Sequence, residues 1–267
     1  GKTTMVRMLT TVLKPDSGRG MVNGFDVRTQ AQAVRRSIGL AGQYAAVDEN
    51  LTGRENLFLV GRLTHMTKGA SMQRADALLA QFRLTDAGNR PVRTYSGGMR
   101  RRLDLGAALV AHPPILFLDE PTTGLDPASR LDLWEVIETL VSDGTTVLLT
   151  TQYLEEADRL ADNIVVIDKG LIAAEGTAKE LKARLGDTVI EFECDSSDIA
   201  ERAAALLGGT HAAGTIVRVV MTDGPATLRD ALNQLAAADI TPHHVALREP
   251  TLDDVFLTLT GTSGENA

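Results

Sequence analysis

Apolar and polar residues alternate along the first two thirds of the chain in blocks that predict strands separated by helices. Short apolar runs between turn residues are typical of buried strands, whereas apolar residues at every third or fourth position are typical of amphipathic helices. The predicted strands are 18–23, 38–41, 115–119, 145–150 and 163–168. The predicted helices are 5–13, 127–142 and 153–161. Strands that alternate with helices in this way favour a parallel sheet covered by helices.

A helical stretch interrupts this alternation between two of the predicted strands. Two apolar helical faces follow one another there, and a third helix is expected between Ser96 and His112. Pro113 and Pro114 end that third helix, because proline restricts the residue before it to extended conformations. We therefore predict a helical subdomain over about residues 44–112.

The pattern changes after Gly186. The strands and helices predicted beyond it are 188–194, 197–207, 215–221, 226–238, 243–247 and 252–260. They form a small α+β unit, so we predict two domains, residues 1–185 and 186–267. This second domain carries no catalytic constellation. We interpret His243 and His244 as surface or core residues rather than metal ligands, because no further ligands cluster with them.

Composition narrows the classes of protein that fit this pattern. The chain has 267 residues, of which 43% are hydrophobic, enough for one large core or two smaller ones. A net charge of −8 argues against a nucleic-acid partner. The single Cys194 excludes a disulfide within the chain. No apolar stretch approaches the ~20 residues of a membrane helix, so we expect any membrane role to come through another chain.

Two adjacent carboxylates, Asp119 and Glu120, follow directly after the apolar run that begins at Ile115. In open α/β sheets, ligands bind at the carboxyl ends of strands. At such a place Asp119 can hold Mg²⁺ and Glu120 can polarise an attacking water. The alternative is a solvated turn, but the following sequence Pro-Thr-Thr-Gly-Leu-Asp-Pro favours the functional interpretation.

The first residues, Gly1, Lys2, Thr3 and Thr4, match the second half of a phosphate-binding loop that opens a helix. The strand and the glycine that normally precede them are not in this sequence. We therefore expect the full-length protein to begin about 35–45 residues earlier, enough for two strands and a loop. We also expect the chain as written to bind ATP more weakly than the full-length protein, because most of the loop N–H donors are missing.

A second candidate for anion binding is the sequence Ser96-Gly97-Gly98, which precedes a predicted helix. Glycines let backbone N–H groups approach an anion, and the helix N-terminus adds a partial positive charge. The same sequence is also a common helix cap, and both interpretations stay open on the sequence alone. We interpret the following run Arg100-Arg101-Arg102 as a solvated helix face rather than a direct phosphate contact.

Six short motifs together resemble one family. They are GKTT, Gln43, YSGGM, ILFLDEP, GLDP and TTQYLEEAD, in this order. Over about residues 1–185 they resemble the ATP-binding subunit of an ABC transporter, and this implies an α/β fold of the P-loop NTPase type. The daunorubicin/doxorubicin-resistance type is suggested by NGFDV at Asn23–Val27, by Thr150–Asp158, and by REPTLDDVF at Arg248–Phe256.

The resemblance implies a head-to-tail pair of ATPase domains, with ATP between GKTT of one subunit and SGGM of the other. We expect a homodimer, and pairing with a different subunit stays open on the sequence alone. It assigns nucleotide binding to Gly1, Lys2, Thr3, Thr4, Gln43, Ser96, Gly97, Gly98 and Asp126. Mg²⁺ would be held by Thr3, Gln43 and Asp119, and catalysis would rest on Glu120 and Gln152. Gln43 alone would be interpreted as an exposed amide, and Asp126 can also cap the helix that begins at Pro127.

The sequence departs from the family pattern at two of these motifs. Gln152 stands where the family usually has His, and an amide cannot take up a proton near neutral pH. Our hypothesis is that Gln152 is a neutral contact to the γ-phosphate that permits slower hydrolysis; the alternative is a non-catalytic residue at a helix start. Met99 replaces the usual Gln of the SGGQ signature, and we expect its thioether to pack rather than to form hydrogen bonds.

The leading functional hypothesis is the ATP-hydrolysing subunit of an exporter for a drug or lipid. It implies a separate membrane permease and a peripheral position on the cytoplasmic face of the cell membrane. Alternatives are a non-transport ABC ATPase, which would carry a long coiled coil or tandem cassettes, and a regulatory module that does not hydrolyse ATP. Glu120 argues against the regulatory module, whereas Gln152 keeps it open. For the second domain, we hypothesise that the apolar residues of Leu252–Phe256 dock it on a neighbouring protein.

Overall fold

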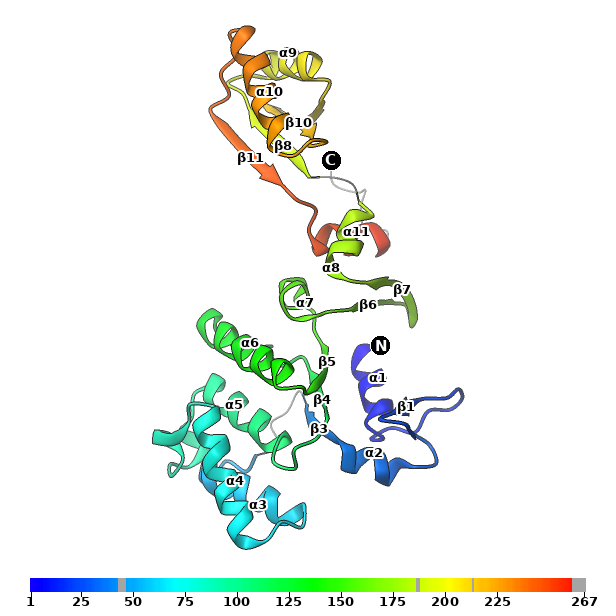
Figure 1. Ribbon diagram of the computed structural model, residues 1–267, viewed down its shortest axis with the longest axis vertical. Helices are drawn as coiled ribbons and strands as arrows, with labels where there is room; N and C mark the ends of the chain where they lie inside the picture. Colours follow the sequence, from blue (N-terminus) through cyan, green and yellow to red (C-terminus); the bar gives the residue numbers. More distant parts are fainter. Residues whose placement is uncertain (43–46, 186–187, 213, 261–267) are drawn as a thin grey trace. The chain divides into compact units, whose positions relative to one another are not determined.

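The computed structural model describes residues 1–42, 47–185, 188–212 and 214–260. The chain divides into two compact units, Gly1–Leu160 and Ala161–Ala267, whose elements are labelled in Figure 1. Each unit is described separately.

Unit 1 is built on a parallel sheet of three strands in the order β3-β4-β5. The strands are β3 (Ile38–Ala41), β4 (Ile115–Asp119) and β5 (Thr146–Thr150). The central strand β4 is apolar up to Asp119 and its last four residues are buried, as expected for a strand that is covered on both faces. The predicted parallel sheet and the predicted limits of β3 and β4 are confirmed.

Helices cover both faces of this sheet, and the side chains of β4 alternate between them (Figure 1). Leu116 and Leu118 pack in a cluster with residues of α5 (Gly97–Ala108) and α6 (Pro127–Ser142). Phe117 points to the other face, where it packs with Val6 and Val34. The sheet is thereby fixed between two apolar layers, with the end of β4 left free for polar residues.

The other helices of unit 1 are α1, α2, α3, α4 and α7. Their limits are Lys2–Leu9, Ala31–Ser37, Gly53–Leu63, Lys68–Gln81 and Leu154–Leu160. The sequence did not predict α2. The strand expected at 18–23 is shorter than predicted, β1 (Met21–Val22), and the sequence did not predict its antiparallel partner β2 (Phe25–Asp26). Asn23 and Gly24, with φ of 50° and 79°, form the tight turn between them.

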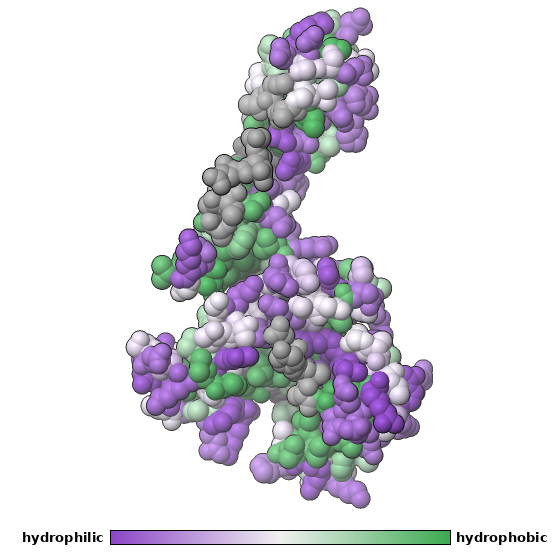
Figure 2. All heavy atoms as spheres, turned by 180° about the vertical axis from the view of Figure 1, so that it is seen from behind, coloured by the Kyte–Doolittle hydropathy of each residue, from purple (hydrophilic) through white to green (hydrophobic). Residues whose placement is uncertain are grey.

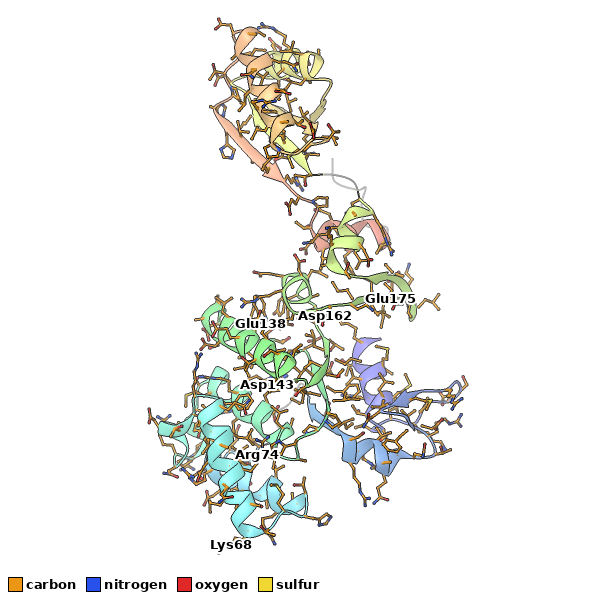
Figure 3. All side chains as sticks on the ribbon, in the orientation of Figure 1. Lys68, Arg74, Glu138, Asp143, Asp162 and Glu175 are labelled. Carbon is orange, nitrogen blue, oxygen red and sulfur yellow. The ribbon has the colours of Figure 1, made fainter. Side chains whose placement is uncertain are left out.

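The helices α3, α4 and α5 occupy the segment in which the helical subdomain was predicted. α3 begins with a capping box, in which Thr52 accepts from the Glu55 backbone and Glu55 accepts from the Thr52 backbone. α3 and α4 lie side by side (Figure 1). The C-terminus of α5 is fixed by Arg74 of α4, labelled in Figure 3, whose Nη2 donates to the Leu109 carbonyl oxygen at 2.6 Å.

Unit 2 begins with an antiparallel hairpin of β6 (Ile164–Asp168) and β7 (Leu171–Gly176), followed by α8 (Ala178–Ala183). The strand predicted at 163–168 is confirmed. The prediction that it belongs to the parallel sheet is wrong, because it pairs antiparallel with β7. Lys169 and Gly170, with φ of 47° and 83°, turn the chain back on itself, so β6 pairs with the next strand instead.

The rest of unit 2 follows the order strand-helix-strand-strand-helix-strand. The elements are β8 (Val189–Glu193), α9 (Ser197–Leu207), β9 (Thr210–Ala212), β10 (Ile216–Val220), α10 (Pro225–Ala237) and β11 (His244–Arg248). The strands pair antiparallel in the order β11-β8-β10-β9, which is the ferredoxin-like arrangement. Ile190 and Phe192 of β8 pack under Leu235 of α10. The last helix is α11 (Leu252–Thr260).

Several exposed apolar side chains of unit 2 belong to the β6–β7 hairpin and to α11, in the green central region of Figure 2. They are Val165, Leu171, Ile172, Phe256, Leu257 and Leu259, and others lie on α9, α10, β10 and β11. Among the described residues, no helix has the length and hydropathy needed to cross a bilayer.

The structure divides at residues 160 and 161, and the predicted domain boundary at residues 185 and 186 stays a prediction.

Close packing of β3 against α5 generates a prediction about stability. A Cβ at Gly39 would clash with the Ala108 backbone carbonyl oxygen, whereas a Cβ at Gly69 in α4 would meet nothing within 4 Å. We expect Gly39→Ala to lower the free energy of unfolding by about 1–3 kcal/mol. The control Gly69→Ala leaves it unchanged or raises it by up to about 1 kcal/mol. The single Trp134 lies in unit 1, so urea unfolding followed by its fluorescence measures this unit. Equal midpoints for the two variants would contradict the packing argument.

Candidate functional site

The carboxylate of Asp119 is the centre of the candidate site in unit 1. It stands at the end of β4 and is only 5% exposed. Thr150 at the end of β5 donates its hydroxyl to Asp119 Oδ1 at 2.5 Å, and Thr3 of α1 donates to the same oxygen at 3.2 Å. Three elements that are far apart in the sequence therefore meet at one carboxylate. Carboxylate and hydroxyl oxygens are the hard donors that suit Mg²⁺.

Lys2 joins this group from the first turn of α1. Its Nζ donates to the Thr151 carbonyl oxygen at 2.8 Å, just after the end of β5. The N-terminus of α1, with Gly1 at its N-cap, lies beside the same strand ends. Gly1 and Thr4 are exposed. An ammonium group, a helix N-terminus and a carboxylate with its hydroxyl donors together offer the charges that a phosphate–metal pair needs.

Glu120 follows Asp119 in an unusual backbone conformation, with φ of 49°. Its backbone N–H donates to the Thr150 carbonyl oxygen at 3.0 Å, which keeps the turn next to β5. Its carboxylate is half-buried, and Oε2 accepts from the Thr123 hydroxyl at 3.3 Å. Non-glycine residues with such φ values are uncommon and cluster at functional positions.

A second group of the predicted residues lies where α5 and α6 begin. Ser96 is the N-cap of α5 and accepts from the Met99 backbone at 3.2 Å. Gly98 packs so closely on Ser129 that a Cβ would lie 2.6 Å from the Ser129 hydroxyl oxygen. Asp126 caps α6 and accepts from the Ser129 hydroxyl at 2.6 Å, and this hydrogen bond lowers the pKa of Asp126. The alternative role of Asp126 as a helix cap is confirmed.

The remaining predicted residues lie elsewhere. Gln43 falls outside the described residues. Gln152 is exposed, in the bend between β5 and α7. Gly97 is exposed at the start of α5. Met99 packs against the apolar core, as predicted for a thioether.

Two residues of the site were missed from the sequence. Thr150 was not singled out, although a hydroxyl at the end of the neighbouring strand is a signal that could have found it. The interpretation of Arg101 as part of a solvated face is wrong: its side chain is 11% exposed. It lies against Asp104, one turn further along α5, at 3.2 Å. The spacing of these two charges is the one sequence signal for an ion pair.

The comparisons with known proteins agree with this geometry. Residues 1–123 match the family model described as ABC transporter, and residues 176–260 match that of the DrrA1-3-like C-terminal domain. The daunorubicin resistance ATP-binding protein DrrA3 of Streptomyces coeruleorubidus is 52% identical, over 98% of this chain and 84% of that protein. The linearmycin resistance ATP-binding protein LnrL of Bacillus subtilis is 34% identical, over 98% and 86%.

A solved structure of an ATP-binding cassette is also similar to this chain. It is a dimeric ATP-binding cassette in a post-hydrolysis state with ADP and Pi, and it matches 66% of this chain and 80% of its own. The TM-score is 0.60 at 25% identity. The chain belongs to the ATP-binding subunits of ABC transporters, in the family of daunorubicin and doxorubicin resistance ATP-binding proteins. It is an ATPase with a P-loop NTPase fold, and the resemblance seen in its motifs is confirmed.

The hydroxyl of Thr150 generates a prediction about turnover. Thr150→Val keeps the shape of the side chain but removes the donor to Asp119. A hydrogen bond to a charged group contributes about 1.5–3 kcal/mol, so we expect kcat/KM for ATP to fall about tenfold or more. Thr146→Val, at the exposed start of the same strand, is the control and keeps the wild-type rate. An unchanged rate in both variants would show that the Asp119 carboxylate does not need this donor.

Proposed function

We propose that this subunit drives export of an amphiphilic drug or lipid through a separate membrane permease, from the cytoplasmic face of the cell membrane. The relatives support the choice of cargo class, because they are named for resistance to daunorubicin, doxorubicin and linearmycin. The observation that carries the proposal is the hydrogen-bonded convergence of Lys2, Thr3 and Asp119 at the strand ends. The cargo itself is recognised by the permease, so its identity lies outside this chain.

Two copies would bind ATP between them in a head-to-tail homodimer. Gly1, Lys2, Thr3 and Thr4 of one copy would contact the phosphates, with the Lys2 ammonium on the β- and γ-phosphates. Ser96, Gly97 and Gly98 of the other copy would hold the γ-phosphate with backbone N–H groups at the start of α5, and Asp126 would reach across the seam. The dimeric arrangement of the matching cassette supports this assembly.

Thr3, Asp119 and Gln43 would hold Mg²⁺, and of these Thr3 and Asp119 belong to the described residues. The buried Asp119 carboxylate and the Thr3 hydroxyl are hard oxygen donors, which suit a divalent cation. Bound Mg²⁺ would neutralise part of the negative charge of the phosphates. Thr150 and Thr3 hold the Asp119 carboxylate in position for it.

Glu120 would accept a proton from the water that attacks the γ-phosphate. Its position at the end of β4, beside the Asp119 carboxylate, supports this role, and Thr123 orients its carboxylate. Gln152 would be a neutral hydrogen-bonding contact to the γ-phosphate. An amide keeps one protonation state, so this contact would not change with pH near neutrality.

The role of Glu120 is tested in the full-length protein. Glu120→Gln removes the proton acceptor but keeps the size of the side chain, so we expect ATP turnover to fall about 10²–10⁴-fold. Nucleotide binding, measured by calorimetry, stays within twofold of the wild type, and ATP-dependent dimers accumulate. Glu135→Gln on α6 changes an exposed carboxylate and is the control. Turnover that survives in Glu120→Gln would overturn the assignment of the base, and the absence of nucleotide-dependent dimers would overturn the shared site.

The contact assigned to Gln152 makes a separate prediction. We expect Gln152→Ala to reduce kcat about three- to tenfold, the kinetic equivalent of one neutral hydrogen bond. We expect Gln152→His to turn over ATP at least as fast as the wild type. Its rate also depends on pH near neutrality, because imidazole titrates there. The measurement is ATP turnover from pH 6 to 9 in steps of about half a unit. Unchanged turnover in Gln152→Ala would leave this residue without a catalytic role.

A further inference from the structure

The side chain of Arg101 connects α5 with the backbone beside Glu120 and with the backbone at the end of β3. It belongs to α5, one turn after the Ser96–Gly98 segment that begins this helix. Its Nε donates to the Pro121 carbonyl oxygen at 2.7 Å, and its Nη1 donates to the Gly42 carbonyl oxygen at 2.5 Å. Pro121 directly follows Glu120, and Gly42 directly precedes Gln43.

A third acceptor lies on the metal side of the site. Nη2 of Arg101 donates to the backbone carbonyl oxygen of Asp119 at 3.5 Å, a long and weak hydrogen bond. One planar guanidinium therefore reaches the backbone on both sides of Glu120 and the backbone at the end of β3. The rigid fork of an arginine suits this set of acceptors, whereas a lysine ammonium lacks the spread-out donors.

The charge of Arg101 is held by buried carboxylates. Asp104 is 2% exposed and pairs with Nη1 at 3.2 Å. Glu156 of α7 is fully buried and accepts from the Trp134 indole N–H at 2.9 Å. Burial lowers the pKa of Arg101, and the carboxylates of Asp104, Glu156 and Asp119 oppose that shift. The Arg101 guanidinium is therefore fixed by a buried ion pair and by the backbone carbonyl oxygens of Gly42 and Pro121.

We propose that Arg101 is a positioning residue that couples the partner-facing start of α5 to Asp119 and Glu120 in the same copy. This rests on the proposed function, because it needs ATP between two copies. ATP held by one copy would draw in Ser96–Gly98 of the other, and Arg101 transmits this movement to the turn that carries Glu120. In each copy, Glu120 is thereby positioned to activate the hydrolytic water only when the start of α5 contacts the nucleotide bound by the other copy.

The test uses Arg101→Lys in the full-length protein, with Arg100→Lys as the matched control. Arg100 is the preceding residue and pairs with Glu49 in a partly exposed ion pair. We expect Arg101→Lys to lower kcat at least tenfold while calorimetric ATP affinity of the monomer stays within twofold, because Lys2 and Thr3 are untouched. In a Glu120→Gln background, the same substitution weakens ATP-dependent dimerisation at least tenfold. Arg100→Lys changes neither quantity.

A purely structural Arg101 gives a different result: the unfolding midpoint falls, but kcat and dimerisation per folded molecule stay at wild-type values, and this overturns the proposal. If Arg101→Lys does not fold, the double variant Arg101→Leu/Asp104→Leu removes the buried ion pair as a unit, a change that is often tolerated. Wild-type kcat in this folded double variant also overturns the proposal. A wild-type protein without Glu120-dependent turnover or ATP-dependent dimers refutes the proposed function instead.

Discussion

The hydrogen bond from Thr150 to Asp119 joins the ends of β5 and β4 at 2.5 Å, and the geometry of the ATPase site depends on it. These residues are direct partners in the parallel register, so the sheet itself brings them together. A buried carboxylate needs donors, and the Thr150 hydroxyl supplies one from a β-branched side chain with restricted rotamers. The Glu120 backbone N–H donates to the carbonyl and hydroxyl of the same Thr150. One residue therefore positions both the metal-side carboxylate and the turn of the proposed base.

The elements whose limits the sequence predicted best have an amphipathic helical pattern, an uninterrupted apolar run as in β4, or clear start residues such as the Asp126 and Pro127 of α6. The limits of β4, α6, α9 and α11 agree with the predicted ranges 115–119, 127–142, 197–207 and 252–260. The helix α2 was missed because seven residues with two arginines give too few turns for a clear periodicity. The partner of β6 was missed because periodicity identifies a strand but not its pairing. That pairing is set by the positive φ angles of Lys169 and Gly170.

Some residues of the candidate site could be predicted from the sequence and others could not. Lys2, Thr3 and Asp119 could be predicted, because short motifs specify phosphate and metal chemistry with little help from the rest of the chain. Arg101 could not, since its role depends on burial and on backbone acceptors from distant segments. A run of three arginines is typical of a surface, and the local sequence does not say which of them faces the sheet. Only the packing of α5 against β3 settles this.

The burial of Arg101 raises the question of why α5 carries a buried ion pair, Arg101 with Asp104, where it packs against β3. A buried pair of charges is weak as a source of stability, because the loss of hydration offsets much of the attraction. Apolar residues of similar size would fill the same space without that cost. They would not, however, hold the Pro121 and Gly42 carbonyl oxygens at fixed places around one rigid group. The fork of a guanidinium defines directions as well as distances, so these hydrogen bonds orient α5 relative to the ends of β3 and β4. The interaction thus contributes a defined relative position of the helix and the strand ends, which is what the proposed sharing of the ATPase site between two copies requires.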